Sequence, residues 1–323
     1  MGLVQLLVGA GGIYGAFLYY GSLQEDVLSF KSPSGHSFEY SWFLQVIEAG
    51  ANVVLGFVCM LLFEDMRLLS VPQVPYVISG ALQVTAKYCT TASMVAGVSF
   101  PVATLGKSSK MVPVMLGSLL LGNAKYSFRE YLHVGLIVGG TVLVSVAKPS
   151  KSGKGSSGVG VLLLCGALAC DGIVGGTQKR LKRTLAERGM KERNFEMQFL
   201  TNFWMMATAI VLAVSLGEVA PGYRFCMENP SIFWNVLAFA ACSAVGQAFI
   251  FFTISSFDPL VCTTVTTTRK VFSVLYSILM KGHQMNTQGW LGVALASSGI
   301  LGELEQKFSA SRSKKPEDNK KEK

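Results

Sequence analysis

Apolar runs of about 20 residues recur along almost the whole chain, and a short polar stretch interrupts each of them. A helix of about this length crosses a bilayer, because it satisfies its own backbone N–H and C=O groups where no water is present. Half of the 323 residues are hydrophobic and 15% are charged, whereas soluble domains carry about 25% charged residues. The sequence therefore predicts an all-α polytopic membrane protein.

We expect ten transmembrane helices, the first of which is a retained helix and not a cleaved signal peptide. The third and ninth are the least apolar, because they contain Lys87 and the pair Arg269-Lys270. Most of the 28 Lys and Arg residues fall on one side of this arrangement, and the positive-inside rule then places both termini in the cytosol. The predicted spans are 3-23, 42-63, 74-96, 101-122, 129-147, 158-178, 197-217, 232-253, 259-280 and 287-306.

The fourth and ninth spans resemble each other, which suggests an internal repeat. Each begins at a proline and carries paired cations near its middle. Two repeats, 1-150 and 157-306, would each hold five spans and would therefore be inverted across the membrane. The predicted parts of the chain are 1-178 (the first half plus span six), the basic cytosolic loop 179-196, 197-306 (spans seven to ten) and a disordered cytosolic tail, 307-323.

Four cations inside these two spans predict the kind of substrate. A lysine near the bilayer centre costs about 2.5–3.5 kcal/mol and so needs a partner or a purpose. Lys107 and Lys110 are three residues apart and share one helix face, whereas Arg269 and Lys270 are adjacent and diverge by about 100°. Inverted repeats would bring both pairs to one central cavity. Four cations there predict an anionic, phosphate-bearing substrate.

Several other chemistries are excluded or disfavoured. Gly106-Lys107-Ser108 ends like a phosphate-binding loop, but Pro101 stands where that motif needs glycine. We find no catalytic motif and no Cys/His spacing typical of a metal site, so we expect no enzyme, no metal and no cofactor. A membrane-embedded enzyme would need a nucleophile or metal cluster near the cations, and an anion channel would need no counter-substrate. The net charge of +9 reflects topology and not nucleic-acid binding.

Other polar and small residues inside spans have more than one interpretation. Glu48 and Asp171 are each a proton site, a counter-ion, or a structural partner for Lys87 or for a helix-end donor. The spacings Gly135-x3-Gly139 and Gly172-x3-Gly176 predict close helix packing. The candidates for contacts to base or sugar, which could equally form interhelical hydrogen bonds, are Gln247, Phe251, Gln178 and Asn202.

Three segments carry a resemblance to a known family: LGKSSKMVPVML at 105-116, GQAFIFFTISSFDPL at 246-260 and TTTRKVFSVL at 266-275. They resemble the nucleotide-sugar transporter family of the drug/metabolite transporter superfamily. Within it, the chain is most similar to the endoplasmic-reticulum UDP-galactose/UDP-glucose transporter branch. Further matching segments, YYGSLQE at 19-25 and CDGIVGGTQ at 170-178 among them, extend the resemblance over nearly the whole chain.

The resemblance implies an antiporter that exchanges cytosolic UDP-galactose or UDP-glucose for lumenal UMP across the endoplasmic reticulum membrane. It gives a phosphate-binding role to Lys107, Lys110, Arg269 and Lys270. An ATP/ADP exchanger of the same branch and a transporter of the sulfate donor PAPS remain alternatives. Ala103 is more similar to the PAPS branch, and the TTTRK segment is more similar to the UDP-sugar branch. A cation at the position of Lys87 is expected in neither branch.

The C-terminal residues Lys320-Lys321-Glu322-Lys323 resemble the dilysine signal by which coat proteins retrieve membrane proteins to the endoplasmic reticulum. The alternative is a solvated basic tail that obeys the positive-inside rule. We therefore expect a multi-pass protein of the endoplasmic reticulum membrane, with the Golgi as the other location. The lipid bilayer, the nucleotide substrates and a coat protein are its expected partners.

Overall fold

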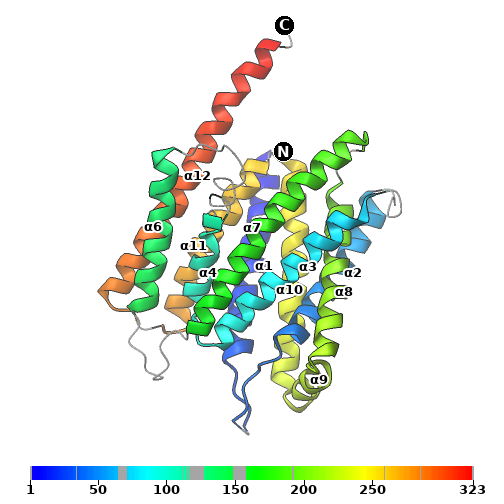
Figure 1. Cartoon of the computed structure of the whole chain (residues 1–323), viewed down its shortest axis with the longest axis vertical. Coiled ribbons are helices and arrows are strands. Elements are labelled where there is room, and N and C mark those ends of the chain that lie inside the picture. Colours follow the sequence, from blue (N-terminus) through cyan, green and yellow to red (C-terminus); the bar gives the residue numbers. More distant parts are fainter. Residues whose placement is uncertain are drawn as a thin grey trace.

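The protein is a bundle of long helices that run roughly side by side (Figure 1). The structure is a computed structural model that describes residues 2–321 except 34, 65–70, 111, 114, 116–126, 148–157, 191–192, 258 and 284. Within these residues it has α1 (Gly2–Ser29), α2 (Ser41–Phe63), α3 (Gln73–Val95), α4 (Phe100–Ser108), α6 (Phe128–Val146), α7 (Gly158–Glu187), α8 (Asn194–Ser215), α9 (Val219–Glu228), α10 (Pro230–Ser256), α11 (Pro259–Met280) and α12 (Thr287–Lys321). The all-α class is confirmed for this part of the chain.

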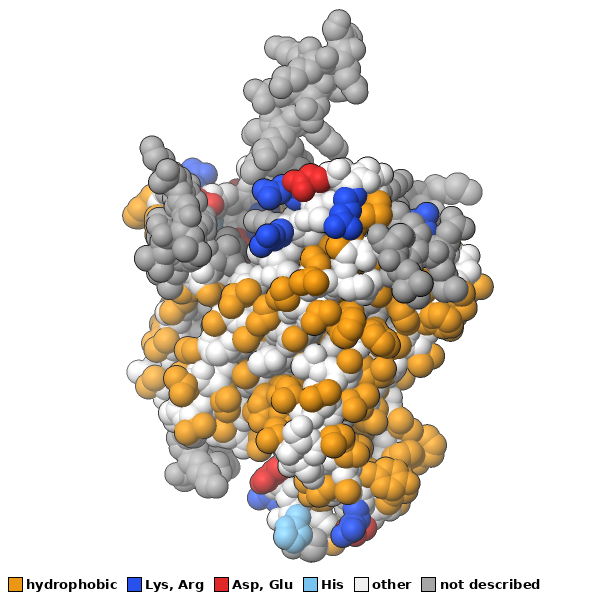
Figure 2. Space-filling model, turned by 45° about the vertical axis from the view of Figure 1, so that its right-hand side comes forward, with side chains coloured by type: hydrophobic (Ala, Val, Ile, Leu, Met, Phe, Trp, Pro, Cys, Tyr) orange, Lys and Arg blue, Asp and Glu red, His pale blue; other side chains and the backbone are white. Residues whose placement is uncertain are grey.

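Among the described residues, six helices are long and apolar enough to cross a membrane, namely α1, α2, α6, α7, α8 and α10. Figure 2 shows hydrophobic side chains over the middle of one face, with charged side chains gathered toward its two ends. These features are those of a polytopic membrane protein. Each predicted span overlaps one helix, and α9 is additional. The number of ten crossings and the inverted repeats stay predictions.

The most extensive helix contacts join the two halves of the chain. α6 packs against α12, α2 against α8, α3 against α7 and α1 against α10. Exchanging the first five spans with the last five would turn the α3–α7 pair into the α10–α1 pair, and would leave α2–α8 and α6–α12 as they are. This pattern is the one that a two-fold relation between inverted repeats would produce.

Two carboxylates cap the α2–α8 pair at opposite ends. Glu64, which follows α2, accepts hydrogen bonds at 3.1 and 2.9 Å from the backbone N–H groups of Phe195 and Glu196 at the start of α8. Glu218, which follows α8, accepts bonds at 2.7 and 3.3 Å from the N–H groups of Trp42 and Phe43 at the start of α2. The first N–H groups of a helix lack intrahelical partners and favour negative charge. The carboxylate that caps the start of each helix therefore lies just beyond the end of the other helix.

Close packing occurs at one of the four glycines that the sequence indicates, because a Cβ at Gly172 on α7 would lie 3.3 Å from the Cβ of Pro113. A Cβ at Gly135, Gly139 or Gly176 would meet nothing within 4 Å, so the expectation for these glycines is wrong. A Cβ at Gly140 would lie 2.5 Å from the backbone nitrogen of Ala296 on α12. Gly140 is buried and Gly139 is exposed, because adjacent residues of a helix point about 100° apart. On α6, the glycine spacing therefore identified a helix that packs closely against another, but not the helix face that makes the contact.

Helix α4 ends well before the end of the predicted span 101-122. It stops at Ser108, and the N–H of Ser109 bonds to the carbonyl of Gly106 at 2.8 Å. Pro113 lacks the N–H that would bond to the carbonyl of Ser109 in a continuous α-helix, and this carbonyl instead accepts a 2.9 Å bond from the N–H of Val112. The rest of the predicted span lies largely outside the described residues.

Helix α12 extends to Lys321 and thus gives a helical backbone to most of the 307–323 segment, where the sequence predicts disorder. The lysines, the arginine, the glutamates and the alanine of this segment are good helix formers. An ion pair of 2.6 Å between Lys307 and Glu303 adds local support one turn apart. The side chains of the C-terminal lysines lie outside the described part of the chain.

Candidate functional site

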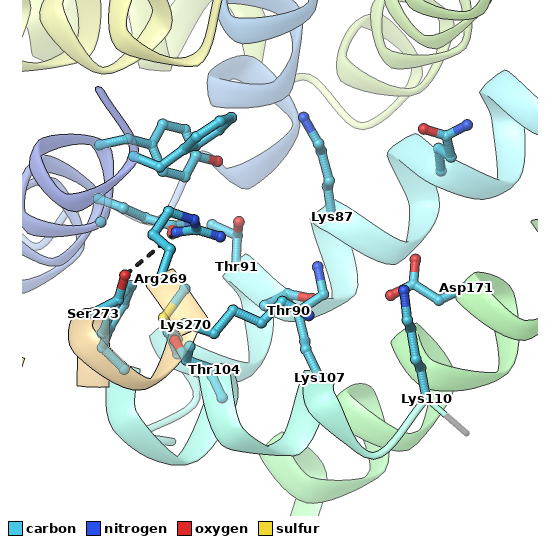
Figure 3. A pocket seen from close by; sticks show the side chains of 18 of the residues that line it. Lys87, Thr90, Thr91, Thr104, Lys107, Lys110, Asp171, Arg269, Lys270 and Ser273 are labelled. Carbon is cyan, nitrogen blue, oxygen red and sulfur yellow. Dashed lines mark hydrogen bonds between the residues drawn. The ribbon is translucent and has the colours of Figure 1, made fainter. Parts of the chain in front are cut away.

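A polar cavity of about 470 Å³ lies among α1, α2, α3, α4, α7 and α11. Its volume is within the range of about 300–1,000 Å³ that is usual for small-molecule sites. The described lining includes five cations, one carboxylate and several amide and hydroxyl groups. Figure 3 shows these side chains directed into one space. The cations are Lys87, Lys107, Lys110, Arg269 and Lys270.

All four cations that the sequence predicts to bind phosphate lie at this cavity, although about 160 residues separate the two pairs. α4 supplies Lys107 in its last turn, and Lys110 follows in the turn after the helix. α4 ends here, and Ser109 and Lys110 form a turn. Broken helices of this kind are typical of transporter binding sites. The phosphate-binding role of these residues stays a prediction.

Arg269 is held from two sides, and part of its guanidinium is unpaired. Its Nη1 donates a 3.3 Å hydrogen bond to Ser273 Oγ on the next turn of α11. Its guanidinium carbon lies 4.9 Å from the centre of the Phe17 ring, which places the cation over an aromatic face. Among the described atoms, the buried Nε has no hydrogen-bond partner. A buried donor without a partner is costly, so it favours the arrival of an acceptor.

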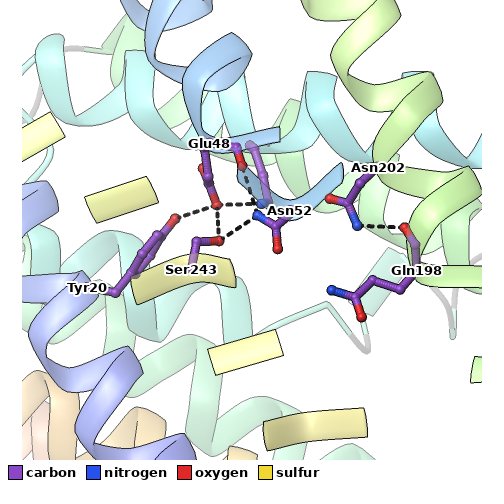
Figure 4. A network of polar contacts seen from close by, with 7 residues as sticks. Tyr20, Glu48, Asn52, Gln198, Asn202 and Ser243 are labelled. Carbon is purple, nitrogen blue, oxygen red and sulfur yellow. Dashed lines mark hydrogen bonds and ion pairs between the residues drawn. The ribbon is translucent and has the colours of Figure 1, made fainter. Parts of the chain in front are cut away.

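Lys87 is the fifth cation, and it has a counter-ion. Its Nζ lies 2.6 Å from Oε1 of Glu48 on α2. The same oxygen accepts hydrogen bonds from the hydroxyls of Tyr20 at 3.2 Å and Ser243 at 2.8 Å (Figure 4). The sequence left several roles open for Glu48, and the structure shows one of them, which is to pair with Lys87. Asn52 joins the network by donating to Ser243 Oγ at 3.0 Å.

Of the residues predicted to contact base or sugar, Gln178 on α7 lines the cavity. Gln247, Phe251 and Asn202 are not among its described lining residues. The Phe251 ring lies 6.0 Å from the Phe195 ring, and Asn202 donates to the carbonyl of Gln198 at 2.9 Å. Both contacts join helices or neighbouring turns. Asp171, the second intramembrane acid, faces the cavity (Figure 3).

The sequence did not single out several polar residues that line the cavity. They share one property, which is a polar side chain within a predominantly apolar span. That property alone does not reveal which helix face meets the cavity. The residues are Gln24 on α1, Gln45 on α2, and Gln83, Thr90 and Thr91 on α3.

Comparisons with known proteins agree with this architecture. A solved crystal structure matches 93% of this chain and 97% of its own with a TM-score of 0.55, at 14% sequence identity, which shows a shared fold alone. A relative from Dictyostelium discoideum, named solute carrier family 35 member B1, is 32% identical over 93% of this chain and 76% of its own. Relatives of that name from Gallus gallus and Danio rerio are each 31% identical, over 90% and 94% of this chain and 89% and 92% of their own.

These names correct the finer assignment, because they are not those of a UDP-galactose/UDP-glucose branch. The model of the UAA transporter family matches residues 5–307. The chain belongs to the UAA transporter family, within the nucleotide and nucleotide-sugar transporters, and is a membrane transporter and not an enzyme.

Proposed function

We propose that this protein is an antiporter that exchanges ATP for ADP across the endoplasmic reticulum membrane. The cavity with five cations carries this proposal, since each phosphate of a substrate adds negative charge and acceptor oxygens. Relatives named solute carrier family 35 member B1 support it further, since they favour the ATP/ADP exchanger that the sequence left as an alternative. Exchange of UDP-galactose or UDP-glucose for UMP is the second candidate, favoured by the TTTRK segment at 266–270.

Phosphate groups are bound, in this proposal, by Lys107, Lys110, Arg269 and Lys270. Arginine binds phosphate in a bidentate fork, whereas lysine acts as a point charge on a longer stem. Gln178 is the proposed contact to base or ribose from α7, because an amide both donates and accepts hydrogen bonds. Asp171 is a counter-ion that limits repulsion among the cations.

The coupling of the two fluxes follows from electrostatics. A cavity whose described cations outnumber its described carboxylate is costly in a membrane when no ligand is bound, so the unloaded carrier should reorient slowly. A phosphate-bearing ligand lowers that barrier in either direction. An ion pair and a histidine–carboxylate contact join the end of α1 to the residues that follow α11: Lys281 Nζ is 2.6 Å from Asp26 Oδ1, and His283 Nε2 contacts Glu25 Oε1. Alternating access requires such contacts to form and break.

Uptake into proteoliposomes tests the proposed function. We expect labelled ATP to enter vesicles that are preloaded with ADP and to enter unloaded vesicles much more slowly. Unlabelled ATP and ADP should compete more strongly than UDP-galactose, UDP-glucose, PAPS or GDP-mannose. Stronger competition by the two UDP-sugars, with internal UMP as the effective counter-substrate, would instead establish the second candidate. Equal uptake into loaded and unloaded vesicles would contradict exchange and indicate a channel.

The endoplasmic reticulum location rests on the C-terminal lysines, and a short extension tests it. Three alanines added after Lys323 keep every charge but displace Lys320 and Lys321 from the terminus. A receptor that reads the signal by its position would release the extended protein to the Golgi. Fluorescence microscopy of tagged cells measures this change. The matched control is an insertion of three alanines after Gly189, because α7 extends to Glu187, α8 begins at Asn194 and the connection between them is shorter than the predicted loop 179–196. Unchanged residence in the reticulum would show that another feature retains the protein.

A further inference from the structure

We propose that Lys87 is a fifth phosphate-binding cation, which Glu48 holds until a substrate phosphate takes its place, and that this pair makes the transporter prefer nucleoside di- and triphosphates to monophosphates. The inference rests on the proposed function and concerns the same cavity. It assigns a role to an ion pair that the resemblance to known transporters does not predict.

Lys87 is positioned to reach a ligand. Its side chain is 28% exposed, although it lies on a helix in the middle of the bundle, whereas its partner Glu48 is 1% exposed. It lines the same cavity as Lys107 and Lys270 (Figure 3). An ammonium group has three N–H donors. In the described part of the chain, one hydrogen bond of Lys87 is seen, and it goes to Glu48, so donors remain for a phosphate oxygen.

Glu48 remains hydrogen-bonded when Lys87 moves away. Tyr20 and Ser243 donate to the same oxygen as Lys87, from α1 and α10. Asn52 supports Ser243 and also donates to the backbone carbonyl of Glu48 at 2.9 Å. The two donors to the carboxylate lie on α1 and α10, Asn52 on α2 supports one of them, and none of these bonds depends on Lys87 (Figure 4). A carboxylate that keeps such partners can release its cation at a lower cost than an isolated one.

Stability alone gives little reason to keep this pair. Replacing a buried ion pair with apolar residues is often neutral or stabilising, and each charge is costly within a membrane. Four other cations share the cavity with Lys87, and like charges at close range repel. Glu48 offsets this repulsion while keeping Lys87 at the cavity wall. The pair therefore has the properties expected of a phosphate-binding lysine that is paired with a carboxylate while no phosphate is bound.

Lys87 should affect substrates according to their charge. A second or third phosphate adds negative charge and acceptor oxygens that a monophosphate lacks. A fifth cation then contributes to binding the additional phosphates more than to binding the first. We expect the ratio of the inhibition constants of AMP and ATP to report this contribution, since both carry the same base and ribose.

The experiment compares this ratio between variants of the full chain in proteoliposomes that contain ADP. Unlabelled AMP, ADP and ATP compete with labelled ATP for uptake. The deciding variant is Lys87→Gln/Glu48→Gln, which removes both charges together and leaves no unpaired buried ion. The control is Arg183→Gln/Glu187→Gln, which removes an exposed pair at 3.2 Å on α7. A further variant, Glu48→Gln alone, keeps the charge of Lys87 and removes its counter-ion.

We expect the double variant to lower the AMP/ATP ratio about tenfold, as for the loss of one charge-assisted hydrogen bond. Glu48→Gln should raise the ratio, because Lys87 no longer has to leave a counter-ion. A ratio within about twofold of wild type in the double variant overturns the inference. If that variant does not fold, a ratio in Glu48→Gln that does not rise has the same meaning. Failure of the wild-type protein to exchange ATP overturns the proposed function instead.

Discussion

Arg269→Ala is expected to abolish nucleotide exchange while leaving the protein folded. The guanidinium lies at the cavity, over the Phe17 ring and bonded to Ser273, with its Nε unpaired among the described atoms. Removing one partner of a desolvated, charge-assisted contact costs about 2–5 kcal/mol, which corresponds to a loss of roughly 30-fold to 4,000-fold in uptake at limiting substrate. The fold should persist, because Ser273 can bond to a carbonyl of its own helix.

Arg269→Lys separates charge from geometry. It keeps the cation but loses the planar fork that binds two phosphate oxygens at once. We expect exchange well below that of the wild type and above that of Arg269→Ala. Arg188→Ala, an exposed cation in the basic loop, is the control for total charge. Near-normal uptake by Arg269→Lys would mean that this position contributes charge only, and near-normal uptake by Arg269→Ala would refute the assignment of the site.

Gly140→Leu is expected to cause the largest loss of stability among single substitutions on α6. A Cβ there would lie 2.5 Å from the nitrogen of Ala296 and 2.6 Å from the carbonyl oxygen of Gly292. Backbone atoms cannot move aside as a flexible side chain can, so α6 and α12 must separate. Close backbone contact through small residues drives helix association in membranes. We expect a loss of about 3 kcal/mol or more, at or above the usual range for overpacking.

The adjacent substitution provides a matched control for this prediction. Gly139→Leu makes the same chemical change one residue away, where a Cβ meets nothing within 4 Å and the residue is exposed. Leucine is also the better helix former. Thermal unfolding in detergent should therefore show a lower midpoint for Gly140→Leu and an unchanged or higher one for Gly139→Leu. Equal midpoints would contradict the close approach of α6 and α12.

The chemical character of the site was predictable from the sequence, and its composition was only partly so. Cations inside apolar spans are costly, so Lys107, Lys110, Arg269 and Lys270 stood out without any structure. The structure brings all four to one cavity and adds Lys87. Three of the four candidates for base or sugar contacts lie outside the described lining. A polar residue in a span has two plausible roles, and the sequence cannot tell which face meets the cavity.

The sequence by itself determined that this is a helical membrane protein built around cations, because hydrophobic length and the cost of buried charge depend on local composition alone. Only the tertiary structure decided which charges meet. Lys87 and Glu48 lie on different helices and pair at 2.6 Å, and Gly140 contacts α12 while Gly139 does not. Both outcomes depend on how helices distant in sequence rotate against each other. A periodic pattern fixes the face of one helix but not its partner.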